Sequence, residues 1–220
     1  MINGERIIDF LVESRIIGVI RTGDLTTALE LARAFTEGGL KVVEVTSTIP
    51  GWEMVLSEAV RMAGEDVCLG LGSVMTSEQI HKAVELGAKF VVSPVFIGDV
   101  VASGRVLEVP VIPGALTPTE IYQAVNAGVD IVKVFPVSAV GGPGYIKALL
   151  GPMPGLKLIP TGGVQPDDAA EYIRAGALAV GMGTNLAPRD ALEKRDWRKV
   201  SQSVADFLAS LKAALKGGAE

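Results

Sequence analysis

The amino-acid sequence predicts an α/β protein, a single (β/α)8 TIM barrel with an additional N-terminal helix. Eight short, β-branched runs alternate with longer segments of helical period. The clearest helical segments close with a glycine at or near their ends, after which the next apolar run begins. No change in composition and no linker divides the chain, so we expect residues 1–220 to form one domain.

The eight predicted strands are nearly continuous in apolar character, as is typical of parallel strands buried on both faces. In chain order they are IIGVI (16–20), KVVEV (41–45), VCLGL (67–71), FVVS (90–93), VPVI (109–112), IVKVF (131–135), KLIP (157–160) and LAVGM (178–182). An open, doubly wound sheet has the same local pattern and is the main alternative. Eight strands within 220 residues favour closure into a barrel.

Helices are predicted between the strands from apolar spacings of three and four residues and from their end signals. The clearest are residues 25–39, 76–88, 117–128 and 165–176. The first stops at Gly38-Gly39, and the third has Pro118 in its first turn. We also expect an N-terminal helix within 1–15, a final helix within 190–215 and a frayed tail at 216–220.

The composition is that of a globular protein, with 49% hydrophobic and 20% charged residues. The formal net charge is −5 and no basic stripe is visible, so we expect no nucleic-acid partner. There is one cysteine, Cys68, and one histidine, His81. These counts exclude an intrachain disulfide and argue against a Cys-rich or His-rich metal site, so Cys68 is interpreted as a packing residue and His81 as a solvated one.

The N-terminal segment carries charges at Glu5, Arg6 and Asp9 and lacks the unbroken apolar stretch of a signal peptide. No run approaches about 18 consecutive apolar residues, so we expect no membrane span and no membrane partner. The sequence therefore predicts a soluble, cytoplasmic protein. Its mean hydropathy of +0.41 is high for such a protein and fits an interior rich in buried parallel strands.

Two charged residues are embedded in predicted strands, near the ends at which a barrel carries its active site. Glu44 lies in V-V-E-V-T and Lys133 in I-V-K-V-F. Burying either charge alone costs several kcal/mol. The strands are the second and the sixth, and alternate strands supply the same layer of a barrel interior, so the two side chains are predicted to face each other. The alternative is a structural ion pair, or one side chain that points outward.

A buried lysine suits one particular chemistry. Desolvation disfavours the ammonium form and lowers the pKa of the amine, and the neutral amine attacks a ketone to form a Schiff base. The protonated imine withdraws electrons from a neighbouring C–C bond, while a nearby carboxylate moves the protons. Lys133 and Glu44 are therefore a minimal set for aldol cleavage through an enamine.

Two glycine-rich turns follow the seventh and eighth predicted strands, T-G-G-V (161–164) and G-M-G-T-N (181–185). Glycines let the backbone approach an anion closely, and the following helix offers unpaired N–H groups. In barrels, these two loops are the commonest phosphate-binding site. The sequence thus predicts a phosphorylated ligand there, with Thr184 as an additional hydroxyl donor.

Six segments together resemble the 2-keto-3-deoxy-6-phosphogluconate (KDPG) aldolases, a family that includes 4-hydroxy-2-oxoglutarate aldolases. They are GGLKVVEVT (38–46), GLGSV (70–74), FVVSP (90–94), VIPGALTPTEI (111–121), VKVFP (132–136) and LIPTGGV (158–164). Their order and spacing match the family from about residue 16 to 186. The resemblance implies a class I aldolase of carbohydrate metabolism (the Entner–Doudoroff pathway) that acts on a 2-keto acid, uses no metal or other cofactor, and is commonly a homotrimer.

The resemblance also implies roles for individual residues. Lys133, in the K-x-F-P motif, corresponds to the Schiff-base lysine, and Glu44, in E-V-T, to the proton shuttle. Ser73 stands where many members have the threonine of G-x-G-T. The other implied substrate-binding residues are Pro94, Phe135 and Thr161, and phosphate binding maps to Gly162, Gly163, Gly183 and Thr184.

One departure from the family pattern concerns the substrate carboxylate. Many members read E-V-T-x-R-T, and that arginine binds the carboxylate, whereas this chain has Thr48 in its place. Arg21, just after the first predicted strand, supplies the positive charge in our hypothesis.

Three alternatives remain open at the level of sequence. A 4-hydroxy-2-oxoglutarate aldolase, which yields pyruvate and glyoxylate, would keep the mechanism and change the substrate. A sugar-phosphate isomerase or epimerase would share the phosphate loops, but its metal-dependent forms need more histidines than one. A non-catalytic or engineered assembly subunit would share the barrel, and the intact Lys133 and Glu44 argue against it.

Overall fold

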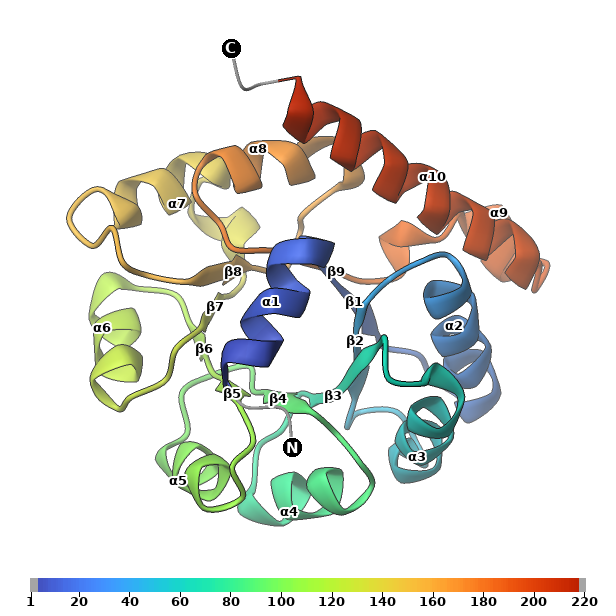
Figure 1. Ribbon diagram of the computed structural model, residues 1–220, viewed down its shortest axis with the longest axis horizontal. Helices are drawn as coiled ribbons and strands as arrows, with labels where there is room; N and C mark the ends of the chain where they lie inside the picture. Colours follow the sequence, from blue (N-terminus) through green and yellow to red (C-terminus); the bar gives the residue numbers. More distant parts are fainter. Residues whose placement is uncertain (1–3, 218–220) are drawn as a thin grey trace.

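The computed structural model describes residues 4–217, which form parallel strands surrounded by helices (Figure 1). The strands are β1 (Ile16–Ile20), β2 (Val42–Thr46), β3 (Cys68–Gly72), β4 (Phe90–Val92), β5 (Val111–Ile112), β6 (Gly114–Ala115), β7 (Val132–Val134), β8 (Leu158–Pro160) and β9 (Val180–Met182). The helices are α1 (Gly4–Ser14), α2 (Leu25–Glu37), α3 (Trp52–Ala63), α4 (Ser77–Glu85), α5 (Gly98–Val106), α6 (Pro118–Asn126), α7 (Pro143–Leu150), α8 (Ala169–Arg174), α9 (Arg189–Glu193) and α10 (Trp197–Lys216). Three short 3-10 helices follow β7, β8 and β9, at η1 (Val137–Val140), η2 (Pro166–Asp168) and η3 (Thr184–Leu186).

The end signals in the sequence explain where several of these helices start. The Thr76 and Thr117 hydroxyls each accept a hydrogen bond from the backbone N–H three residues on. The backbone N–H groups of these two threonines donate in turn to the side-chain oxygens of Gln79 and Glu120. The predicted final helix is in fact two, α9 and α10. The last of these runs on to Lys216, and the predicted tail lies outside the described residues from position 218 on.

The strand ladder differs from the predicted closed set of eight. The described strands form a six-stranded parallel sheet, β5-β4-β3-β2-β1-β9, and a three-stranded parallel sheet, β6-β7-β8. The predicted strand at 109–112 gives way to two short ones because Pro113, which has no N–H to donate, separates β5 from β6. The architecture is therefore α/β with a curled parallel sheet of the TIM-barrel kind.

The two sheets meet at both of their edges. At one edge the two sheets are joined by the chain itself, which passes from β5 through Pro113 to β6, and the Lys133 N–H bond to the Pro113 carbonyl continues the β6–β7 ladder. At the other edge the Leu178 N–H donates to the Leu158 carbonyl at 2.9 Å, and Thr161 and Gly181 form an isolated parallel bridge.

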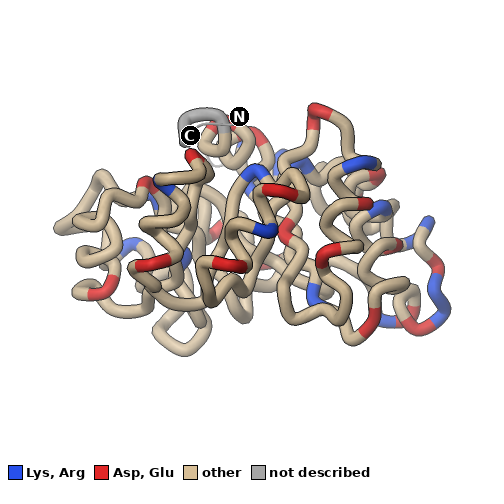
Figure 2. The backbone as a smooth tube through the Cα atoms, turned by 90° about the horizontal axis from the view of Figure 1, so that it is seen from below, with Lys and Arg blue, Asp and Glu red and all other residues tan. Residues whose placement is uncertain are grey.

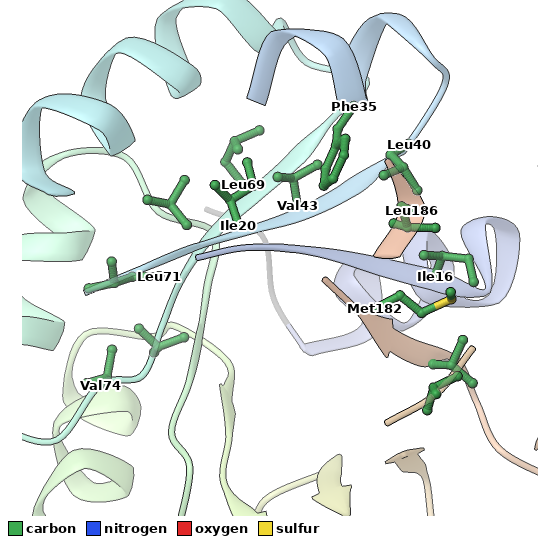
Figure 3. Close-up of a cluster of buried hydrophobic side chains, with 14 of the residues drawn as sticks. Ile16, Ile20, Phe35, Leu40, Val43, Leu69, Leu71, Val74, Met182 and Leu186 are labelled. Atoms are coloured by element: carbon green, nitrogen blue, oxygen red, sulfur yellow. The ribbon is translucent and has the colours of Figure 1, made fainter. Parts of the chain in front are cut away.

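Alternate strand residues point to two apolar regions. The outward region packs strands against helices, and Figure 3 shows Ile20, Val43 and Leu71 together with Phe35 from α2. The inward region fills the space enclosed by the strands with Ile17, Val42, Cys68, Phe90, Val92, Ile112, Ile131, Ile159 and Ala179. Ile7 and Leu11 of α1 join this inward cluster, and Figure 1 shows α1 lying across one end of the ring of strands.

None of the helices within residues 4–217 has both the length and the apolar composition needed to cross a bilayer. Acidic and basic residues are interspersed over the helices (Figure 2).

The packing of α1 gives a prediction about stability. Leu11→Ala should lower the free energy of unfolding by about 2–5 kcal/mol, because Leu11 is fully buried in the inward cluster and its removal leaves a cavity. Val12→Ala, at an exposed position of the same helix, is the control and should change stability by less than about 0.5 kcal/mol. Denaturant unfolding measures both, and equal losses would contradict the buried position of Leu11.

Candidate active site

A cavity of about 380 Å³ opens at the carboxyl ends of β1, β7, β8 and β9. Its walls include eight of the residues singled out from the sequence, Arg21, Lys133, Phe135, Thr161, Gly162, Gly163, Gly183 and Thr184. This is the end of the strands at which barrel enzymes place their chemistry. α1 lies on the other side of the inward apolar cluster and so does not compete for this space.

The period of two along each strand explains which side chains reach the cavity. Ile131 points into the inward apolar cluster, so Lys133 and Phe135 share its face of β7. On β2, Val42 points into the same cluster, so Glu44, two residues further on, also lies on the inward face. The site is thus the continuation of the inward apolar cluster, with polar residues at the carboxyl ends of the strands.

Lys133 is almost completely buried, with 5% of its surface exposed, and it lines the cavity. Its Nζ lies 4.9 Å from the centre of the Phe135 ring. Burial lowers the pKa of this amine from its ordinary value of 10.5, the charge of Glu44 opposes the change, and that of Arg21 adds to it. An amine in this setting is more often neutral, and hence more nucleophilic, than a lysine in water.

Glu44 is 2% exposed and does not line the cavity itself. Burial raises the pKa of its carboxyl group, while the positive charges of Lys133 and Arg21 lower it. Its Oε1 is buried and has no hydrogen-bond partner among the described residues. Glu44 and Lys133 therefore lie close enough for the charge of each to shift the pKa of the other.

Arg21 and Ser73 come together from the ends of β1 and β3. The Arg21 Nη2 donates a hydrogen bond of 2.9 Å to the Ser73 Oγ. Ser73 adopts a left-handed backbone conformation with φ of 59°, which is uncommon for a residue other than glycine. Its carbonyl accepts a 2.8 Å bond from the Ser47 hydroxyl, which ties this turn to the end of β2. The turn therefore presents an arginine and a serine side by side.

Three of the predicted substrate-binding residues do not line the cavity: Ser73, described above, Thr48 and Pro94. Thr48 is exposed and shares a 3.0 Å hydrogen bond with the hydroxyl of Thr46, which in turn donates to the Ile20 carbonyl. Pro94 is half-buried, and its carbonyl lies where a side chain at Gly114 would be. Thr48 and Pro94 both support strand ends beside the cavity.

The two glycine-rich turns follow β8 and β9, and both line the cavity. Gly162 and Gly163 have φ of 84° and 90°, in the region that glycine alone adopts without strain. Neither donates a hydrogen bond from its N–H to a described residue, so both are available to an anion. Gly183 is the N-cap of η3, which begins at Thr184.

The sequence analysis missed residues that hold these two turns together. Asn185 follows Thr184 and donates from Nδ2 to the Val164 carbonyl at 2.7 Å, which links the second turn to the first. Gln165 donates from Nε2 to the Gly163 carbonyl at 3.1 Å. Both residues also line the cavity. The sequence pointed to them only by their position, since each follows a glycine turn directly and carries an amide side chain that can both donate and accept hydrogen bonds.

The family model for KDPG and KHG aldolases matches residues 7–203. The chain belongs to this family. Its curated relatives include the 2-dehydro-3-deoxy-phosphogluconate aldolase of Treponema pallidum (strain Nichols), which is 36% identical over 196 residues, or 89% of this chain and 92% of that protein. The resemblance noted from the six sequence segments is thereby confirmed.

Solved structures show the same fold. The KDPG aldolase of Legionella pneumophila, with pyruvate captured as a covalent carbinolamine, is 30% identical and superposes with a TM-score of 0.83 over 91% of this chain and 97% of that one. A cube-shaped cage designed by fusing symmetric oligomeric domains contains a chain that is 29% identical, with a TM-score of 0.82 over 92% of this chain and 73% of that one.

The charges around Lys133 predict opposite effects of two substitutions on its titration. Arg21→Gln should raise the pKa of Lys133 by removing a like charge, and Glu44→Gln should lower it further by removing an opposite one. Acetylation rates at a series of pH values, followed by peptide mass spectrometry, report the neutral amine. The exposed Lys157 is the internal reference and should respond to neither change. Shifts in the same direction, or titration of Lys133 at 10.5 in the wild type, would contradict the electrostatics described above.

Proposed function

We propose that this protein is a class I aldolase that cleaves KDPG reversibly to pyruvate and D-glyceraldehyde 3-phosphate. The observation that carries the proposal is the buried Lys133 amine, which lines the cavity and interacts with the buried Glu44. The name of the Treponema relative and the pyruvate carbinolamine of the Legionella structure support the same activity and mechanism.

The reaction begins when the neutral Lys133 amine attacks the C2 ketone and water leaves, which gives a protonated imine. Glu44, acting through a bound water, removes the proton of the C4 hydroxyl. The C3–C4 bond breaks, its electron pair flows into the imine to form an enamine, and the C4 oxygen becomes the aldehyde. The enamine takes up a proton at C3, and hydrolysis of the imine releases pyruvate and the free amine.

Substrate binding divides between two walls of the cavity. Arg21 and the Ser73 hydroxyl form the carboxylate site, with the cation supplied after β1 in place of an arginine at position 48. The free N–H groups of Gly162 and Gly163 and the start of η3 form the phosphate site. Phe135 and Thr161 line the space between these two ends.

We further propose that the two sheets act as one closed (β/α)8 barrel, and that this barrel is the single domain of the chain. The continuous chain from β5 to β6 at one sheet edge, and the Leu178–Leu158 hydrogen bond with the Thr161–Gly181 bridge at the other, support closure. A homotrimer is proposed as the assembly, supported by the symmetric oligomeric domains named for the cage, and light scattering measures its mass in solution. The cytoplasmic location stays a prediction from the sequence.

Two alternatives differ from the proposal in one respect each. A 4-hydroxy-2-oxoglutarate aldolase would use the same lysine on a substrate without phosphate, and the free N–H groups of Gly162 and Gly163 favour the phosphorylated substrate. An assembly subunit without activity would not need Lys133 and Glu44 buried together at a cost in folding free energy.

Reduction with borohydride in the presence of pyruvate should attach a pyruvate-derived group to Lys133. Lys133→Met should abolish both the adduct and turnover, because the amine is the nucleophile. Glu44→Gln should lower the turnover rate by about 10²–10⁴ while the adduct still forms, since proton transfer and imine formation are separate steps. Peptide mass spectrometry locates the adduct, and a label on another lysine, or none, would exclude this mechanism.

The two ends of the cavity predict different effects on the two candidate substrates. Arg21→Ala should raise KM for both KDPG and 4-hydroxy-2-oxoglutarate by about tenfold or more, because both carry the carboxylate and a charged hydrogen bond contributes about 1.5–3 kcal/mol. Thr184→Val should raise KM for KDPG alone. Steady-state kinetics on both substrates measures this, and an unchanged affinity of Arg21→Ala for pyruvate would reject the carboxylate assignment.

A further inference from the structure

Gly72 is the last residue of β3, and its backbone does not require glycine. Its φ lies outside the positive region that favours glycine, and it pairs in register with Thr46 of β2. Glycine inside a strand weakens the strand and often marks a place where another group approaches closely. The atoms packed against position 72 therefore have to explain why it is a glycine.

The group that lies against Gly72 is the Glu44 carboxylate. A Cβ at position 72 would stand 1.7 Å from Glu44 Oε1, 2.2 Å from its Cδ and 2.5 Å from its Cγ. These distances are far below van der Waals contact, so the end of the Glu44 side chain occupies the volume that any other residue would fill. Oε1 is also the buried atom without a hydrogen-bond partner among the described residues. Because no side chain or backbone group within residues 4–217 donates to that oxygen, the space that Gly72 leaves is the feature of the described structure that sets its location.

We propose that Gly72 is a positioning residue for Glu44: because position 72 has no side chain, the Glu44 carboxylate occupies the space next to it. The inference rests on the proposed function, in which Glu44 moves the protons of the aldol cleavage. General acid–base catalysis depends on placing the carboxylate within hydrogen-bond reach, and a displacement of about 1 Å can cost roughly 10²-fold in rate. A methyl group at position 72 displaces the carboxylate by at least that much.

Gly70 provides a matched control on the same strand. It is buried two residues before Gly72, and the nearest atoms that a Cβ there would meet belong to the Phe90 ring, at 2.6 Å, whereas at Gly72 they belong to Glu44. A change at Gly70 thus disturbs the same face of β3 by packing alone.

The first experiment compares Gly72→Ala with Gly70→Ala. Gly72→Ala should lower kcat for KDPG cleavage by about 10²-fold, with a much smaller change in KM, and should still form the pyruvate adduct on Lys133. Gly70→Ala should lower the melting temperature and leave kcat within about threefold of the wild type. A Gly72→Ala enzyme with kcat within threefold of the wild type would overturn the proposal. If the wild type itself forms no adduct on Lys133, the proposed function fails instead.

The second experiment tests the contact without relying on activity. In a Glu44→Ala background the space beside Gly72 is empty, so adding Gly72→Ala should not lower the melting temperature further. In the wild-type background the same substitution should lower the melting temperature by several degrees. Equal destabilisation in both backgrounds would show that Gly72 does not contact Glu44, and the proposal would be wrong.

Discussion

The burial of one amine and one carboxylate in an otherwise apolar interior is the constraint on which this structure depends. Removing Lys133 and Glu44 from water costs several kcal/mol, and the cost is the source of their shifted pKa values. A site of this kind needs a rigid, dry surrounding that does not relax around the charges. Parallel strands with paired backbones supply it, and Ile7 and Leu11 of α1 close the end of the interior opposite the cavity.

The two ends of the strands consequently have different tasks. At the α1 end, side chains are large and aliphatic, and they contribute the free energy of folding. At the other end, glycines and a left-handed serine replace them, and Ser73 adopts a positive φ that is unfavourable for a residue other than glycine. The aliphatic half of the interior thus offsets the cost of the buried charges and of this backbone conformation.

Arg21 has a double role in the electrostatics of the site. Its charge lowers the pKa of both Glu44 and Lys133, so it favours the ionised carboxylate and the neutral amine at the same time. Both are the reactive forms for proton removal and for attack on a ketone. In the proposed function, Arg21 therefore serves Lys133 and Glu44 as well as the substrate carboxylate, which compensates for the absence of a cation at Thr48.

The sequence by itself determined the order of strands and helices, the inward faces of β2 and β7, and the glycine turns after β8 and β9, because apolar periodicity and turn chemistry are local properties. Tertiary structure alone decided the pairing of Arg21 with Ser73, the position of Thr48 outside the cavity and the approach of the Glu44 carboxylate to Gly72. Each of these depends on the register between strands that lie far apart in the chain. A glycine in a strand does not show, from its neighbours in sequence, which side chain fills its empty space.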